Sequence, residues 1–220
     1  MLVEKYVESG RHVEVQVFAD AHGGRYAHPA IVEQIAKVGL PPAPASAPAG
    51  VMNKPGFKVL HVQDVDQRST CQPLVACLQE VRAWSQQHPG HLPIFILLET
   101  KQSPVQLSFP TVQPEPFDRK AMDALDAELR SVFQPGEYVS PDAVRGTARP
   151  LNAAVLAHGW PALRATRGKV VFLLDQRAAG ASYLPGHPSL RGRVCFTNAE
   201  PGQDEAVQST AAHLDDVNAR

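Results

Sequence analysis

Carboxylate, amide and imidazole side chains recur in this sequence where short apolar runs end, and they could bind a hard cation and transfer a proton. Glu14 and Gln16 stand two apart inside the first such run, and Glu99 ends a later one. Lys101 follows Glu99 at the same spacing. Because strand residues two apart point to the same face, each pair would share a face. Ca²⁺ prefers several oxygen ligands, so the sequence predicts a calcium site.

The setting of Glu14 supports this interpretation. Glu14 and Gln16 lie within an apolar run, where a buried carboxylate without a partner costs several kcal/mol. That cost favours a cation beside Glu14. The structural alternative is an ordinary salt bridge, from Glu99 to Lys101 or to Arg11, and the sequence leaves both open.

Histidines supply the candidate proton donor. His22 and His28 lie in the glycine-rich loop that follows the first run. We favour His28 as the acid/base group because it can reach the strand ends and an imidazole exchanges protons near neutral pH. His61 is expected within the second apolar run, where a hydrogen-bonded core histidine is the commoner outcome.

The elements that must position these residues alternate regularly. Apolar or β-branched runs predict strands, amphipathic periodicity predicts helices, and the alternation of the two indicates an α/β fold with a parallel sheet. The expected strands are residues 13–18, 57–62, 94–98, 169–174 and 194–197, with a weaker one at 137–139. The expected helices are residues 72–87, 118–133, 151–156 and 204–214. Proline-rich stretches near 40–55 and 103–116 are read as surface excursions.

A parallel barrel would bring the polar strand ends together, since its βα loops converge on one mouth. Asp20, Asp64, Asp175 and Asn198 stand at or just beyond the expected strand ends. For Asp20, Asp64 and Asn198 the simpler interpretation is that polar residues mark where strands stop. The hypothesis of a metal site at these strand ends therefore rests mainly on Glu14, Gln16 and Glu99.

Length and composition fit this scheme. The chain has 220 residues, 44% of them hydrophobic, and a net charge of -1, so we expect one domain over 1–220 with no field for nucleic acid. No apolar run reaches the roughly 20 residues of a membrane span, and no signal peptide is evident. The sequence as written thus predicts a soluble, untargeted chain. A Cys71–Cys77 disulfide and two unrelated cysteines are equally compatible with the spacing.

Five ordered segments resemble the bacterial calcium-dependent phosphatidylinositol-specific phospholipase C family. They are GRHVEVQVFAD with GGRYAHP (10–29), KVLHVQDVD (58–66), HLPIFILLETK (91–101), RGKVVFLLD (167–175) and LRGRVCF (190–196). Each match alone is weak, but their succession over nearly the whole chain is specific.

The resemblance implies a TIM-barrel-like phosphodiesterase in which the inositol 2-hydroxyl attacks phosphorus and releases diacylglycerol. By position, Glu14, Gln16 and Glu99 would hold Ca²⁺, with both glutamates part of the catalytic centre. His28 would protonate the leaving oxygen. The headgroup pocket would be lined by Lys101, Asp175 and His61. The resemblance also implies a phosphoinositide headgroup as partner, at most peripheral membrane contact, and a secreted or periplasmic location.

Two departures from the family pattern bear on activity. The family has Asp where this chain has Gln16, which weakens calcium binding. No His-Asn pair occurs, although the family's first strand ends in one, and we expect the last strand to be absent as well. We therefore expect an incomplete barrel with impaired or lost activity and open edges that allow self-association. The alternatives are a noncatalytic remnant that binds a headgroup or a partner, and a glycerophosphodiester phosphodiesterase.

Overall fold

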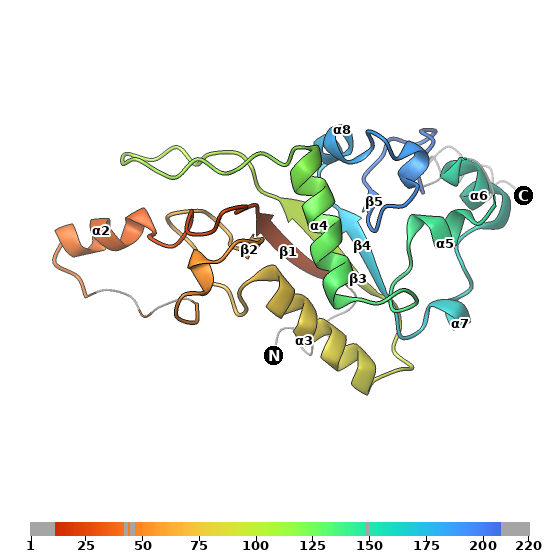
Figure 1. The fold of residues 1–220 in the computed structure, drawn as a ribbon, viewed down its shortest axis with the longest axis horizontal. Coiled ribbons are helices and arrows are strands. Elements are labelled where there is room, and N and C mark those ends of the chain that lie inside the picture. Colours follow the sequence, from red (N-terminus) through yellow and green to blue (C-terminus); the bar gives the residue numbers. More distant parts are fainter. Residues whose placement is uncertain (1–11, 42–43, 45–46, 148–149, 208–220) are drawn as a thin grey trace, which may run out of the picture.

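A computed structural model describes residues 12–41, 44, 47–147 and 150–207. Its five-stranded sheet has the order β2-β1-β3-β4-β5. β1, β3, β4 and β5 run parallel, whereas β2 is antiparallel to β1 (Figure 1). The strands are β1 (His12–Phe18), β2 (Lys58–Val59), β3 (Ile94–Thr100), β4 (Val170–Leu174) and β5 (Phe196–Thr197). The predicted α/β class with a parallel sheet is confirmed.

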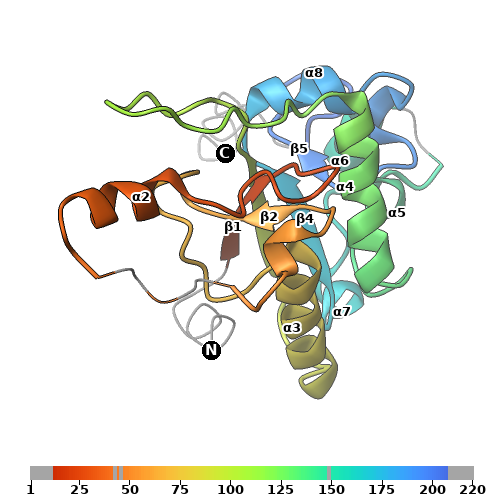
Figure 2. The same ribbon diagram turned by 60° about the vertical axis from the view of Figure 1, so that its left-hand side comes forward.

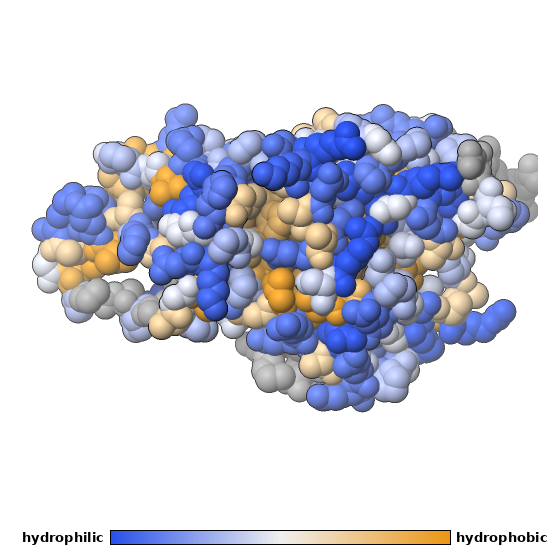
Figure 3. Space-filling model, in the orientation of Figure 1, coloured by the Kyte–Doolittle hydropathy of each residue, from blue (hydrophilic) through white to orange (hydrophobic). Residues whose placement is uncertain are grey.

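Helices α3 and α4 cover one face of the sheet (Figures 1 and 2). Alternate residues of β1 and β3 face them, among them Val13, Val15 and Ile96, which are buried in the main core. The outer sides of the two helices are hydrophilic, and hydrophobic surface shows between them (Figure 3). The helices are α2 (Ala30–Lys37), α3 (Leu74–Gln87), α4 (Arg119–Val132), α5 (Pro141–Arg145), α6 (Leu151–His158), α7 (Leu163–Thr166) and α8 (Gly180–Tyr183). Short 3-10 turns are η1 (Val51–Asn53), η2 (Arg177–Ala179) and η3 (Pro188–Leu190).

The opposite face, which would line the interior of a closed barrel, is open at β1 and β3. Glu14 is exposed, and Phe95 on the neighbouring strand keeps 37% of its surface in solvent. The face is better covered at β5, where Phe196 is buried and contacts the ring of Trp160. In the part of the chain that the structure describes, the sheet does not close, as expected of an incomplete barrel.

Several predicted elements differ from those observed. The strand expected at 57–62 is only Lys58–Val59, and it is antiparallel. The side chain of Gln72 bonds to both the N–H and the C=O of Val59, so a side chain occupies the place of a further strand. The weak strand at 137–139 is a single bridge between Tyr138 and Val170. Residues 204–207 are not helical, and the remainder of the helix expected at 204–214 lies outside the described residues.

A buried polar network fixes the segment that leads into β5. The guanidinium of Arg193 contacts Asp126 of α4 at 3.2 Å and Asp123 at 2.6 Å. The Tyr183 hydroxyl donates to Asp126 and accepts the N–H groups of Val194 and Cys195. Burial raises the pKa of the Asp126 carboxyl, and Tyr183 and the arginines oppose that rise. This network ties β5 to the helix layer.

Two cysteines are joined covalently. Cys71 and Cys77 form a disulfide that ties the residues before α3 to its first turn, which settles the question that their spacing left open. Cys195 is a free, buried thiol. None of the helices in the described residues is both long and apolar enough to cross a bilayer.

Candidate active site

The strand register places two of the predicted ligands side by side. Gln16 on β1 is the direct partner of Glu99 on β3, and Glu14 lies opposite Leu97, one step further from the strand ends. Alternation puts Glu14, Gln16 and Glu99 on the same, open face of the sheet. The expectation that Glu14 is buried is wrong, because no opposing wall covers this face in the described residues.

Glu99 already has a partner. The ammonium of Lys101 lies 3.1 Å from a Glu99 carboxylate oxygen, and both side chains are partly exposed. The salt-bridge alternative is therefore realised with Lys101, while Arg11 lies outside the described residues. The backbone N–H of Lys101 donates to the C=O of Val17. This bond continues the β1–β3 ladder and fixes the position of the Lys101 backbone.

The three predicted ligands are of the type that calcium prefers, but they are too few to complete its coordination. Glu14, Gln16 and Glu99 offer only oxygen ligands, whereas Ca²⁺ takes six to eight. Across the described residues, no three His, Cys, Asp or Glu side chains gather as a metal site. An aspartate at position 16 would add a carboxylate directly opposite Glu99, so the Gln16 substitution matters most here.

Asp175 and Asn198 meet at the ends of β4 and β5. The backbone N–H of Asp175 donates to the C=O of Leu98, and the Asn198 amide donates to the C=O of Asp175. Since β3, β4 and β5 are parallel, these residues stand at the same edge as Glu99 and Lys101. The structure thus brings Gln16, Glu99, Lys101 and Asp175 to one end of the sheet.

The loop after β1 is held by a buried ion pair that sequence reasoning missed. Lys58 and Asp20 are almost wholly buried, with 3.2 Å between the ammonium and a carboxylate oxygen. The ammonium also donates to the C=O groups of Lys54 and Gly56. Gly23 has a left-handed backbone, and a Cβ there would lie 2.3 Å from the Asn53 carbonyl oxygen. The position of Lys58 at the start of an apolar run could have indicated a buried ion pair.

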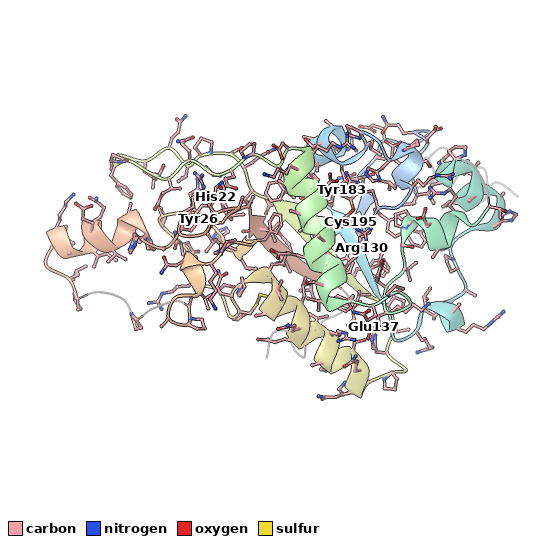
Figure 4. The ribbon with its side chains drawn as sticks, viewed as in Figure 1. His22, Tyr26, Arg130, Glu137, Tyr183 and Cys195 are labelled. Atoms are coloured by element: carbon pink, nitrogen blue, oxygen red, sulfur yellow. A yellow bond between two sulfur atoms is a disulfide. The ribbon has the colours of Figure 1, made fainter. Side chains whose placement is uncertain are left out.

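His28 lies further along this loop, with an exposed side chain at the rim of a cavity of about 420 Å³. The cavity lies between α2 and the segment around η1 and is lined largely by apolar residues, including Ile31, Val32, Ile35, Met52 and Val65. His22 and Tyr26 belong to the same loop (Figure 4). Burial of Tyr26 raises the pKa of its hydroxyl well above the usual value. In the described residues, no hydrogen bond or ion pair joins His28 to Glu14 or Glu99.

His61 is not a core histidine. It lies on the turn after β2, largely exposed, with Nδ1 2.9 Å from a carboxylate oxygen of Asp66. The strand ends earlier than predicted because the chain reverses at Asp64, whose φ of 65° is left-handed. Asp66 lines the same cavity as His28, so His61 lies on the His28 side of the molecule rather than within the sheet.

Comparisons with known proteins agree with this geometry. The family model described as "Phosphoinositide phospholipase C, Ca2+-dependent" matches residues 2–218. The match covers nearly the whole chain. The chain is a member of the calcium-dependent phosphoinositide phospholipase C family. No curated protein sequence gives a significant match.

Solved structures share the fold. A calcium-dependent phosphatidylinositol-specific phospholipase C from Streptomyces antibioticus is similar with a TM-score of 0.60 and 20% identity, over 95% of this chain and 64% of that one. A calcium-dependent phosphoinositol-specific phospholipase C from a Pseudomonas species, in an apo form, gives 0.55 and 20%, over 89% and 58%. Its myoinositol complex gives 0.55 and 20%, over 88% and 58%. The chain therefore spans less than two thirds of the length of these structures.

Proposed function

We propose that this chain carries part of the catalytic centre of a calcium-dependent phosphodiesterase that cleaves phosphatidylinositol-type lipids into diacylglycerol and an inositol phosphate. The observation that carries the proposal is the pairing of Gln16 with Glu99 across β1 and β3, with Glu14 on the same open face. Family membership favours phosphoinositides over glycerophosphodiesters as substrates.

Glu14, Gln16 and Glu99 would hold the cation. When bound, Ca²⁺ would make the inositol 2-hydroxyl more acidic and offset charge on the phosphoryl oxygens. Lys101 can leave Glu99 to contact the phosphate, because the pair is partly exposed and an exposed pair is worth about 1 kcal/mol or less. Asp175 would accept hydrogen bonds from the inositol hydroxyls at the adjacent strand end.

His28 would give its proton to the diacylglycerol oxygen as the phosphorus–oxygen bond breaks. An alkoxide leaves poorly, so a positioned imidazolium is worth roughly 10²–10⁴ in rate. The apolar cavity beside His28 supports this assignment, since the lipid part of the substrate lies on the leaving-group side. His61 would contact the headgroup from the turn after β2.

A second candidate function is headgroup binding without turnover. It is favoured by the Glu99–Lys101 ion pair and by Gln16, which together leave little negative charge to attract a cation. A chain of this kind would still bind inositol phosphates through Lys101 and Asp175. Self-association through the N-terminal half of β1, which has no strand on the side away from β3 in the described residues, belongs to the same hypothesis.

Calcium titration separates the two functions. We expect millimolar Ca²⁺ to raise the unfolding temperature, Glu14→Gln and Glu99→Gln to abolish that rise, and Gln16→Asp to tighten calcium binding about 10-fold by adding a carboxylate. Glu33→Gln is the matched control, since Glu33 is exposed on α2. Release of inositol phosphate from phosphatidylinositol vesicles, with calcium or a chelator, then tests turnover. An unfolding temperature that calcium changes in neither the original chain nor Gln16→Asp would contradict the metal site.

We also propose that the chain functions outside the cytoplasm. The Cys71–Cys77 disulfide supports this location, because disulfides persist mainly in oxidising compartments. Thiol labelling of the protein taken directly from its native host tests the idea: two protected cysteines are expected, and full labelling under denaturing, non-reducing conditions would contradict it.

A further inference from the structure

Within the described part of the chain, no cation pairs with the buried carboxylate of Asp64. Only 1% of its surface is exposed, and no ion pair reaches it among the described residues. Its two oxygens instead accept backbone N–H groups, one from Ala30 at 3.1 Å and one from Val112. A buried carboxylate is stable only when such donors replace water, and hydrogen bonds to a charged acceptor are about twice as strong as neutral ones.

These bonds join three separate segments. Ala30 begins α2, Val112 belongs to the excursion between β3 and α4, and Asp64 itself forms the turn after β2. The C=O of Asp64 also accepts the N–H of Ile31 at 2.9 Å. In Figures 1 and 2, α2 and this excursion extend from the same side of the sheet. Asp64 therefore bonds to both segments.

His28 stands between two anchors of this system. Two residues after it, Ala30 bonds to Asp64. Two residues before it, the hydroxyl of buried Tyr26 donates to the C=O of Ala19. The Gln67 amide completes the frame: in its favourable orientation it donates to the C=O of Tyr26 and accepts the N–H of Asp64. The imidazole is exposed, but the backbone that carries it is fixed on both sides.

We propose that Asp64 is a positioning residue that sets the location of His28 by anchoring the start of α2. The inference rests on the proposed function, in which His28 supplies a proton to the leaving oxygen. It differs from a simple strand-end role, because the carboxylate bonds to the chain next to His28 rather than to its own strand. Displacement of a catalytic group by about 1 Å can cost roughly 100-fold in rate.

Two substitutions at Asp64 weaken its hydrogen bonds to different extents without straining the backbone of the turn. Asp64 has a left-handed backbone, which asparagine tolerates and glycine adopts freely. Asp64→Asn keeps one oxygen acceptor, and Asp64→Gly removes both. We expect kcat for phosphatidylinositol cleavage to fall about 10-fold and about 100-fold respectively, with KM changed less than about 2-fold. Glu33→Gln, an exposed carboxylate on α2, should leave both constants unchanged.

A double variant tests whether Asp64 acts through His28. If it does, adding Asp64→Gly to His28→Ala lowers kcat no further, whereas a general loss of structure would lower it again. Equal kcat in Asp64→Gly and the original chain, or a further fall in the His28→Ala background, would overturn the inference.

Limited trypsin digestion separates failure of the inference from failure of the proposed function. Arg25 lies in the same loop, partly exposed and paired with Glu115 of the excursion. Asp64→Gly should speed cleavage after Arg25 at least about 5-fold, and Asp64→Asn less. If the original chain shows no turnover but digestion follows this order, the proposed function fails and the anchor stands. If the original chain shows turnover but the Asp64 variants change neither the digestion rate nor kcat, the anchoring role of Asp64 is wrong and the proposed function stands.

Discussion

Two buried ion pairs hold opposite sides of the sheet, and they are built differently. Near β5, Asp126 contacts Arg193 and accepts a hydrogen bond from Tyr183, whose hydroxyl also accepts two backbone N–H groups. Beside β1, neither carboxylate oxygen of Asp20 has a hydrogen-bond partner, and the Lys58 ammonium is its only compensation in the described residues. The Asp126 carboxylate is part of a network, while the Asp20 carboxylate depends on a single contact, with Lys58.

The comparison shows where stability is concentrated. A buried carboxylate with several donors tolerates the loss of one, whereas a carboxylate with one partner becomes an uncompensated charge. The weaker arrangement lies under the loop that carries His28, and the networked one lies away from it. Substitutions at the two pairs should therefore differ in size and in what restores them.

Loss of Lys58 should have the largest effect. Lys58→Met leaves Asp20 buried without a cation and should lower the free energy of unfolding by about 3–5 kcal/mol. Adding Asp20→Asn removes the stranded charge, so the double variant should recover at least about 1 kcal/mol. Urea unfolding measures both. A double variant no more stable than Lys58→Met would show that Asp20 is compensated by something else.

Loss of the Tyr183 hydroxyl should come second. Tyr183→Phe leaves Asp126 with one donor fewer and two buried N–H groups without an acceptor, at about 2–3 kcal/mol. Tyr138→Phe is the control, because the Tyr138 hydroxyl makes no hydrogen bond within the described residues, and its cost should stay below about 0.5 kcal/mol. Thermal unfolding compares them, and equal losses would mean that the network adds nothing.

The smallest effect should come from a third, partly exposed pair. Glu137 receives two hydrogen bonds from Arg82 and others from Gln86 and the Gln134 N–H. Although burial raises the pKa of the Glu137 carboxyl, these donors lower it more, to below its usual value of 4.5. The stabilisation is therefore present above about pH 4.5 and is lost as pH falls through the lowered pKa.

Glu137→Gln should thus cost about 1 kcal/mol or less at pH 7 and approach no cost at the acid end. Denaturant unfolding of both proteins over pH 3–7 measures the difference. A cost that stays constant over this range would show that the charge of Glu137 contributes nothing. Glu33→Gln, on an exposed pair, should show almost no cost at any pH.

Much of the fold could be predicted from local patterns. β1, β3, β4, α3 and α4 lie within a few residues of their predicted bounds because long periodic runs define them. A strand was predicted where β2 lies, but its short length and its antiparallel direction could not be, since its end is set by the Gln72 side chain and the turn at Asp64. The small helices α5, α7 and α8 were not predicted, because segments this short carry no clear period.

The candidate site was predictable in part for the same reason. The period of two placed Glu14 with Gln16, and Glu99 with Lys101, on shared faces. The pairing of Gln16 with Glu99 depends on strand register, which arises from packing and not from either segment alone. The exposure of Glu14 depends on what stands across the sheet, and the anchoring by Asp64 depends on contacts from two distant segments.

The position of β3 has a consequence for hydrogen exchange. β3 has strands on both sides, whereas β1 has β2 beside it only at Val17 and Phe18. Amides of β3 should therefore exchange with deuterium uniformly slowly. In the N-terminal half of β1 every second amide points away from β3, so slow and fast exchange should alternate along one strand.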